Sequence, residues 1–259
     1  MIGLAAGLAI SGMKVICYTI TPFITFRCLE QIRDDLCYHD LPVVIVGVGA
    51  GMSYAGLGPT HHSCEDIAVL RSLPNMTVLC PGDPVEVALS LNAALELTGP
   101  SYIRLGKKGE PLVHQETPCF EIGKMIPLKE GSEICILSTG NLLPLADDLQ
   151  KGLEDKGFST GLFSCHSVKP LDIEGLKEVF ANYRFVLSLE EHSLIGGFSS
   201  ALSEWMIDEG LDGSRLLRLG TEDHFFHEAG SQGYARKKLG LTVELILKKV
   251  LEKIVCPVL

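Results

Sequence analysis

Two adjacent histidines, His61 and His62, end a glycine-rich segment and are the clearest candidates for chemistry in this sequence. The segment spans residues 49–62 and contains four glycines, which allow backbone conformations that other residues resist. An imidazole can take up or release a proton near neutral pH, so either histidine could act as an acid or a base. The glycine spacing matches neither a dinucleotide-binding fingerprint nor a P-loop, and the pattern alone leaves a helix-end hydrogen-bonding role equally open.

Two phenylalanines form a second candidate group. Phe23 and Phe26 lie three residues apart at the beginning of an expected helix, so both should project from one side of its first turn. A flat aromatic face can hold a planar ligand by stacking. Packing in the core is, however, the commoner role of such a pair.

Basic side chains follow a short apolar run at Arg104, Lys107 and Lys108. Cations gathered at the end of a strand can bind a phosphate group, and they stand out in an acidic chain. A solvated basic turn fits the composition equally well.

Acidic and imidazole side chains are adjacent at Glu190, Glu191 and His192. Their spacing matches no familiar metal site, so we favour loop and helix capping over metal binding or acid–base chemistry. The nine cysteines include no CxxC pair, and we expect no metal site made by this chain alone. An odd number of cysteines without metal spacing is typical of a protein of the reducing cytoplasm.

Short apolar runs alternate with helix-length amphipathic segments, a pattern typical of an α/β protein with mostly parallel sheets. We expect two domains, at residues 1–106 and 132–259, and a linker at 107–131 where lysine, glycine and proline are frequent. Strands are expected at residues 14–20, 43–48, 76–80, 101–105, 134–138, 159–165, 185–189 and 216–219. Helices are expected at residues 1–11, 22–38, 65–73, 84–97, 142–156, 173–182, 198–209 and 243–254. Ligands of such sheets bind beyond the carboxyl ends of the strands, where Phe23, His61 and Lys107 would lie.

Charge and hydropathy exclude two classes of partner. The 22 basic and 32 acidic residues give a formal net charge of −10, whereas nucleic acids and anionic membranes are bound by cationic patches. No apolar run approaches the roughly 20 residues that span a bilayer. We therefore expect neither a nucleic-acid partner nor a membrane.

Five short segments form a combination that is specific only as a whole: residues 2–9 (IGLAAGLA), 22–33, 58–62 (GPTHH), 65–76 (EDIAVLRSLPNM) and 102–106 (YIRLG). In this order they resemble the C-terminal section of transketolases, thiamine-diphosphate enzymes that move two-carbon ketol units between sugars. The chain looks most like the two-gene form, whose other section carries the diphosphate- and magnesium-binding domain. The resemblance implies a pyrimidine-binding domain followed by a transketolase C-terminal domain that is mainly structural.

The resemblance also implies roles for single residues. Phe23 matches the aromatic residue that stacks on the cofactor's pyrimidine ring, and Phe26 matches a second aromatic of that pocket. His61 matches the histidine that lies over the reacting carbon and exchanges protons with substrate hydroxyls. Arg104 or Lys107 would anchor a sugar phosphate.

The implied partner is the N-terminal section, in a dimer or heterotetramer. Thiamine diphosphate would be shared between the two chains, with Mg²⁺ held mainly by the partner. Gly49 and Leu57 stand where larger transketolases have a second substrate histidine and an acidic residue, which leaves the choice of sugar open.

The family glutamate that hydrogen-bonds the pyrimidine ring falls before residue 1, together with the first strand of the domain, and residues 1–29 contain no carboxylate. We therefore expect the chain as written to have little ketol-transfer activity, even with its partner section. We also expect it to expose apolar surface and to associate, because apolar surface left in water is unfavourable.

Two alternatives stay open. A deoxyxylulose-phosphate synthase or the β-subunit of a 2-oxoacid dehydrogenase would use pyruvate or another 2-oxoacid as its donor, whereas a transketolase uses a ketose. A non-catalytic structural subunit would assemble with its partner without any need for the cofactor.

Overall fold

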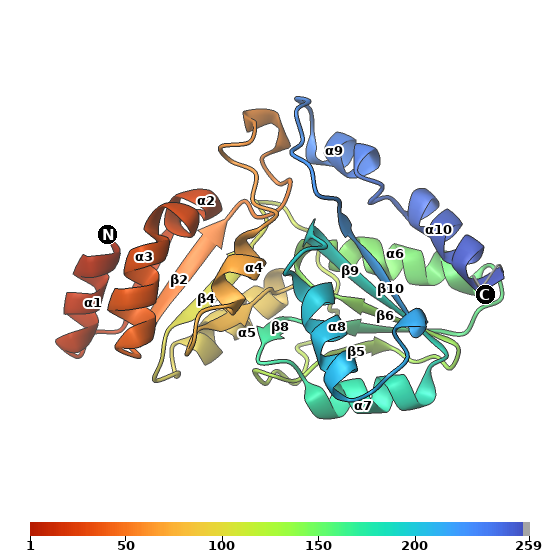
Figure 1. Ribbon diagram of the computed structural model, residues 1–259, viewed down its shortest axis with the longest axis horizontal. Coiled ribbons are helices and arrows are strands. Elements are labelled where there is room, and N and C mark those ends of the chain that lie inside the picture. Colours follow the sequence, from red (N-terminus) through yellow and green to blue (C-terminus); the bar gives the residue numbers. More distant parts are fainter. Residues whose placement is uncertain (256–259) are drawn as a thin grey trace.

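The computed structural model describes residues 1–255 and consists of two α/β domains that lie side by side (Figure 1). Neighbouring strands of the first sheet are, in order, β1 (Val15–Ile20), β2 (Val43–Val48), β4 (Ser101–Leu105), β3 (Thr77–Leu79) and β8 (Ser167–Lys169). Those of the second sheet are β10 (Leu216–Thr221), β9 (Phe185–Ser193), β6 (Ile134–Ser138), β7 (Thr160–Ser164) and β5 (Ile126–Lys129). Only β3–β8 and β5–β7 pair antiparallel, so the expectation of two α/β domains with mostly parallel sheets is confirmed.

Helices cover both sheets (Figure 1). Those of the first domain are α1 (Ile2–Ile10), α2 (Thr21–Ile24), α3 (Leu29–Gln31), α4 (Asp66–Arg71) and α5 (Pro84–Ala94). Those of the second domain are α6 (Leu143–Glu154), α7 (Ile173–Asn182), α8 (Phe198–Asp208), α9 (Gln232–Lys238) and α10 (Val243–Val255). Within residues 1–255, none of these helices combines the length and the apolar character needed to cross a bilayer.

Strand β2 sets the geometry of the candidate site. Its sequence VVIVGV is apolar on both faces, as a central strand of a covered sheet requires, and most of it is buried. It pairs in parallel with β1 and β4, which places Val48 opposite both Ile20 and Leu105. The loops that follow these three strands therefore begin at the same edge of the sheet.

The helix expected at residues 22–38 is interrupted at Thr25. The Thr25 hydroxyl donates a hydrogen bond of 2.7 Å to the carbonyl oxygen of Thr21, an interaction that bends helices. Beyond it the chain continues as a 3₁₀ turn, α3 and a π-helix. Phe23 and Phe26 consequently do not share one regular turn: Phe23 is half-buried in α2, whereas Phe26 is 38% exposed in the 3₁₀ turn.

Strands β5 and β8 and helix α9 have no counterpart among the expected elements. β5 lies inside the segment 107–131 and pairs with β7, so the end of that segment belongs to the second sheet. β8 has only three residues and comes from the second half of the chain, yet it extends the first sheet. Cys80 of the first domain and Cys135 and Leu137 of the second also share one apolar core. The two domains are therefore packed together rather than merely linked.

The cysteines support the expectation of reduced thiols packed as small apolar groups. All eight within the described residues are free, and most are buried. Burial raises the pKa of the Cys80 thiol to about 12, which keeps it protonated and unreactive near neutral pH.

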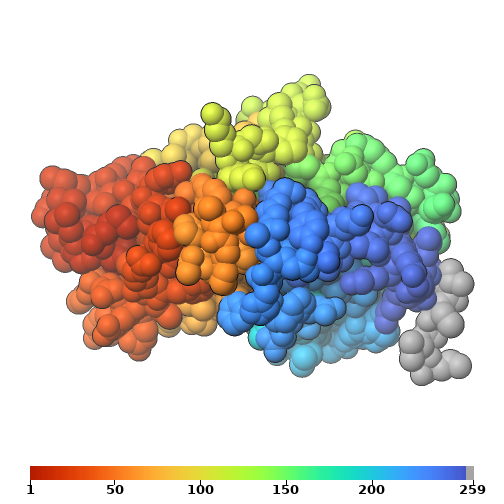
Figure 2. Space-filling view, turned by 90° about the horizontal axis from the view of Figure 1, so that it is seen from above, coloured from red at the N-terminus to blue at the C-terminus, as the bar shows by residue number. Residues whose placement is uncertain are grey.

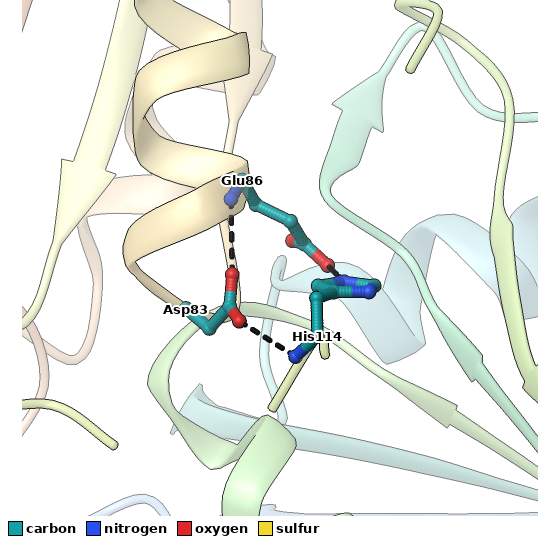
Figure 3. Close-up of side chains that lie close together, drawn as sticks. All are labelled: Asp83, Glu86 and His114. Atoms are coloured by element: carbon teal, nitrogen blue, oxygen red, sulfur yellow. Dashed lines mark hydrogen bonds and ion pairs between the residues drawn. The ribbon is translucent and has the colours of Figure 1, made fainter. Parts of the chain in front are cut away.

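Asp83, Glu86 and His114 join the interdomain segment to the first domain (Figure 3). Asp83 caps α5 by accepting from the Glu86 N–H, and it also accepts from the backbone N–H groups of Val113 and His114. Glu86 accepts from the Gly82 N–H and lies 2.7 Å from Nε2 of His114. Potential ligand atoms of the three side chains lie within 4.8 Å of one another. Because all four carboxylate oxygens already have partners, the arrangement is a structural latch.

This latch predicts a pH-dependent stability. Its hydrogen bond to Glu86 raises the pKa of His114 above the ordinary 6.5. The folded state therefore favours protonated His114. The resulting contribution to the free energy of unfolding is complete below pH 6.5 and is lost as the pH rises through the raised pKa. We expect His114→Gln to reduce the loss of unfolding free energy between pH 6 and pH 8, measured by urea denaturation. The exposed His39→Gln serves as the control, and an equal loss in His114→Gln and the parent protein would contradict the prediction.

Candidate active site

The loop that carries His61 begins at the carboxyl end of β2. Backbone hydrogen bonds from Gly49 and Ala50 to the carbonyl oxygens of Gly106 and Leu105 join it to the segment after β4. Gly49 has a φ of +84°, and a Cβ there would lie 2.0 Å from the Tyr54 ring, so only glycine fits. Gly49 is thus required by a tight turn packed against the Tyr54 ring, a role that the sequence alone does not reveal.

Phe23 and His61 meet at this edge of the sheet. Their ring centroids are 5.1 Å apart with an interplanar angle of 68°, an edge-on contact between α2 and the glycine-rich loop. Thr60 Oγ1 lies 3.0 Å from Nδ1 of His61, which orients the imidazole. Within residues 1–255, Nε2 of His61 has no hydrogen-bond partner. One ring nitrogen is therefore held while the other is free to meet a ligand.

The face of the Phe23 ring accepts a flat charged group. The guanidinium carbon of Arg27, an exposed residue, lies over this ring at 4.6 Å from its centroid. Tyr54 also lies near His61, with the ring centroids 6.5 Å apart. The sequence pattern singles out neither Arg27 nor Tyr54. Arg27 lies four residues after Phe23, and Tyr54 lies inside the glycine-rich segment.

His62 has a different environment from its neighbour. It is buried, its Nε2 lies 3.1 Å from the carbonyl oxygen of Ala55, and its ring lies 6.1 Å from that of Phe226 in the second domain. The spacing of residues 61 and 62 does not distinguish the two histidines. The structure assigns the hydrogen-bonding role to His62 and leaves His61 available for chemistry.

Arg104 lies in the interface between the domains, and its side chain is only 2% exposed. Its Nε donates to Asp66 at 2.8 Å, and Nη2 donates to the carbonyl oxygens of Ser63 and Glu191. Burial opposes the charged form of Asp66, but the Arg104 guanidinium, His192 and the Tyr102 hydroxyl together outweigh it, and the pKa of Asp66 lies below its ordinary value. This geometry gives Arg104 a structural task and offers no support for its expected contact with a sugar phosphate.

Lys107 is exposed and lines a cavity of about 360 Å³. Val48, Leu105 and Asn141 also line it, so the cavity opens at the carboxyl ends of β2 and β4. Phe23 and His61 are not among its lining residues. The structure thus brings Phe23 and His61 together and places Lys107 at a neighbouring cavity of the same sheet edge.

The Glu190–His192 segment joins the two domains. Glu190 accepts from the N–H groups of Phe198 and Ser199 and so caps α8, as expected. His192 Nε2 accepts from the N–H of Ala68 in the first domain. Glu191 is fully buried and pairs with Arg236 at 2.7 Å. The sequence favours capping for the whole segment. It does not reveal that the His192 side chain bonds across the domain interface or that Glu191 is buried with Arg236.

Two family models match the chain. The transketolase pyrimidine-binding domain matches residues 1–110, and the transketolase C-terminal domain matches residues 123–246. These matches cover both domains and leave residues 111–122 and 247–259 unmatched.

Individual relatives agree with the family models. A transketolase C-terminal section of Methanocaldococcus jannaschii is 34% identical over 98% of this chain and 79% of its own length. A subunit of the apulose-4-phosphate transketolase of Actinobacillus succinogenes is 32% identical over 95% of this chain and 79% of its own length. A solved split-gene transketolase, described as an inactive beta4 tetramer, superimposes with a TM-score of 0.87 at 34% identity, covering 95% of this chain and 78% of that one. The chain therefore belongs to the transketolase family and corresponds to the C-terminal section of a split transketolase.

Proposed function

We propose that this chain supplies one wall of a thiamine-diphosphate site, in an enzyme that transfers a two-carbon ketol unit between sugar phosphates. The other wall belongs to the N-terminal section of the same enzyme. The observation that carries the proposal is the contact between Phe23 and His61, which brings a stacking surface and a free imidazole nitrogen to one place.

Phe23 suits the pyrimidine ring of the cofactor. Its face already binds the planar guanidinium of Arg27, so a flat heteroaromatic ring fits the same kind of contact once that exposed side chain moves aside. Phe26, which is 38% exposed, would provide a second apolar contact. When bound, thiamine diphosphate supplies a nucleophilic carbon that no protein side chain offers.

His61 would bind a substrate hydroxyl through Nε2 and exchange a proton with it. Thr60 holds Nδ1, which fixes the direction in which Nε2 points. A neutral imidazole with one free nitrogen can either accept or return a proton near neutral pH.

Lys107 is better placed than Arg104 for a sugar phosphate, because it is exposed at the cavity beside the site whereas Arg104 is buried. The Actinobacillus relative is named for a phosphorylated substrate, apulose-4-phosphate. Mg²⁺ would be bound mainly by the partner section, since the Asp83–Glu86–His114 group of this chain is occupied by its own hydrogen bonds.

An exposed apolar surface supports the proposed partner. Strand β1 is the outermost strand of the first sheet, and Ile16 and Tyr18 on it are 47% and 62% exposed. Leu4 and Ile10 on the adjoining α1 are each 71% exposed. Large exposed apolar side chains on an edge strand and on the helix beside it favour a protein–protein contact at this end of the first domain. We infer a heteromeric assembly in the cytoplasm, where the free cysteines would stay reduced.

The donor used by the enzyme tests this function. A chain that carries these residues together with a pyrimidine-contacting glutamate upstream of them is combined with the N-terminal section, thiamine diphosphate and Mg²⁺. This assembled enzyme is offered a ketose phosphate or pyruvate. We expect ketol transfer from the ketose phosphate and none from pyruvate. Turnover with pyruvate would favour a synthase or a 2-oxoacid dehydrogenase subunit, and cofactor-independent assembly without turnover would favour a structural subunit.

A further inference from the structure

The second domain packs against the back of the His61 loop. Met52 and Ala55 of the loop share an apolar cluster with Phe226, Ala235 and Leu239 of the second domain. Figure 2 shows the two segments in contact, the loop in orange and the region of α9 in blue. The side of the loop away from Phe23 is therefore fixed by residues far along the chain.

The base of the loop is held by a second set of contacts. Gly51 and Ser63 pair through two backbone hydrogen bonds of 2.7 and 3.0 Å, which close the loop two residues after His61. A Cβ on Gly51 would lie 2.8 Å from Cγ of Glu191, and the φ of +61° also requires glycine. Arg104 Nη2 donates at 3.0 Å both to the Ser63 carbonyl and to that of Glu191. Glu191 thus packs against Gly51 at one side of the loop base, and its carbonyl shares the Arg104 donor with Ser63 at the other side.

The Glu191 carboxylate is itself fixed in position. Arg236 of α9 binds it through two nitrogens, with Nη2–Oε2 and Nε–Oε1 distances of 2.7 and 3.1 Å. Gln232, one turn earlier, donates to the same carboxylate at 3.1 Å and to Ser53 of the loop at 3.4 Å. A buried carboxylate held by a two-pronged guanidinium has essentially one geometry, in contrast to the glycine-rich loop that it supports.

We infer that Glu191 and Arg236 are positioning residues, which hold the loop base so that His61 stays against Phe23. The second domain then does more than stabilise the chain: it sets the geometry of the catalytic histidine. The consequence for turnover rests on the proposed function, whereas the consequence for the Phe23–His61 contact does not.

The contact between the two rings provides the test. In the full chain with selectively labelled histidine and phenylalanine, the nuclear Overhauser effect between the rings of Phe23 and His61 is measured by NMR. We expect Arg236→Met to weaken it at least twofold, because the Glu191 carboxylate loses its main partner. The matched control is Arg215→Met, a half-buried arginine of the same domain that donates to the carbonyl of Phe180 away from the loop. It should lower the thermal stability and leave the ring contact unchanged.

An Arg236→Met chain that is folded and keeps the parental ring contact would overturn the inference. If this variant does not fold, the ring contact is measured in Glu191→Gln, which keeps the side-chain volume. A folded Glu191→Gln chain with the parental ring contact would overturn the inference equally. In the assembled enzyme, Arg236→Met should lower kcat more than it changes KM and add little to the loss caused by His61→Ala. Absence of ketol transfer in the assembled enzyme, whose chain also carries the upstream glutamate, would count against the proposed function only, since the ring contact is measured without it.

Discussion

Replacing His61 by alanine is expected to lower ketol transfer in the assembled enzyme by about 100- to 10,000-fold, the usual contribution of a positioned acid or base. The side chain is half-buried, and its only side-chain hydrogen bond within the described residues is to Thr60. The free energy of unfolding should therefore change little. Steady-state kinetics and urea denaturation of the same preparation separate the two effects.

The exposed His39→Ala is the control for this experiment, because His39 lies outside the loop and its aromatic contact is with Tyr38. It should leave turnover at the parental value. Turnover of His61→Ala within about threefold of the parent protein would remove His61 from the mechanism, since even modest proton-transfer catalysis exceeds that factor.

Arg104→Met is expected to have the largest effect on stability, a loss of about 3–5 kcal/mol. The variant leaves Asp66 as a fully buried carboxylate without its cationic partner, and it also deprives two backbone carbonyls of their donor. Tyr102 donates to Asp66 at 2.6 Å but cannot neutralise its charge. Urea denaturation measures the loss.

Two comparisons sharpen the result for Arg104. Arg33→Met removes an exposed ion pair with Asp34 and should cost less than about 1 kcal/mol. Adding Asp66→Leu to Arg104→Met should recover part of the lost stability, because the unpaired buried charge is then gone. A loss below about 1 kcal/mol in Arg104→Met, or no recovery in the double variant, would show that the buried pair does not stabilise the fold.

Much of the fold could be predicted from local pattern. The run VVIVGV marks β2 at its observed bounds, and an Asp–Pro pair marks the beginning of α5, where Asp83 accepts the capping hydrogen bond. β8 could not be predicted, because it has three residues and pairs with a strand of the other domain. The break at Thr25 depends on a hydroxyl that turns back to a carbonyl oxygen, and the helical periodicity of residues 22–38 does not reveal it.

The candidate site divides in the same way. Phe23 and His61 could be selected from the sequence because each follows a strand, and parallel strands bring their following loops to one edge. The functions of Arg104 and Glu191 could not be predicted, since a charged side chain beside a turn is normally solvated and its burial depends on the second domain. The choice between His61 and His62 likewise depends on Phe226, far away in the chain.

The most direct measurement is a crystal structure of the assembled enzyme with thiamine diphosphate bound. We predict that the pyrimidine ring stacks on Phe23 and that Nε2 of His61 faces the side on which substrate binds. A cofactor bound far from Phe23 and His61, whose contact with each other is unchanged, would contradict the assignment of this site.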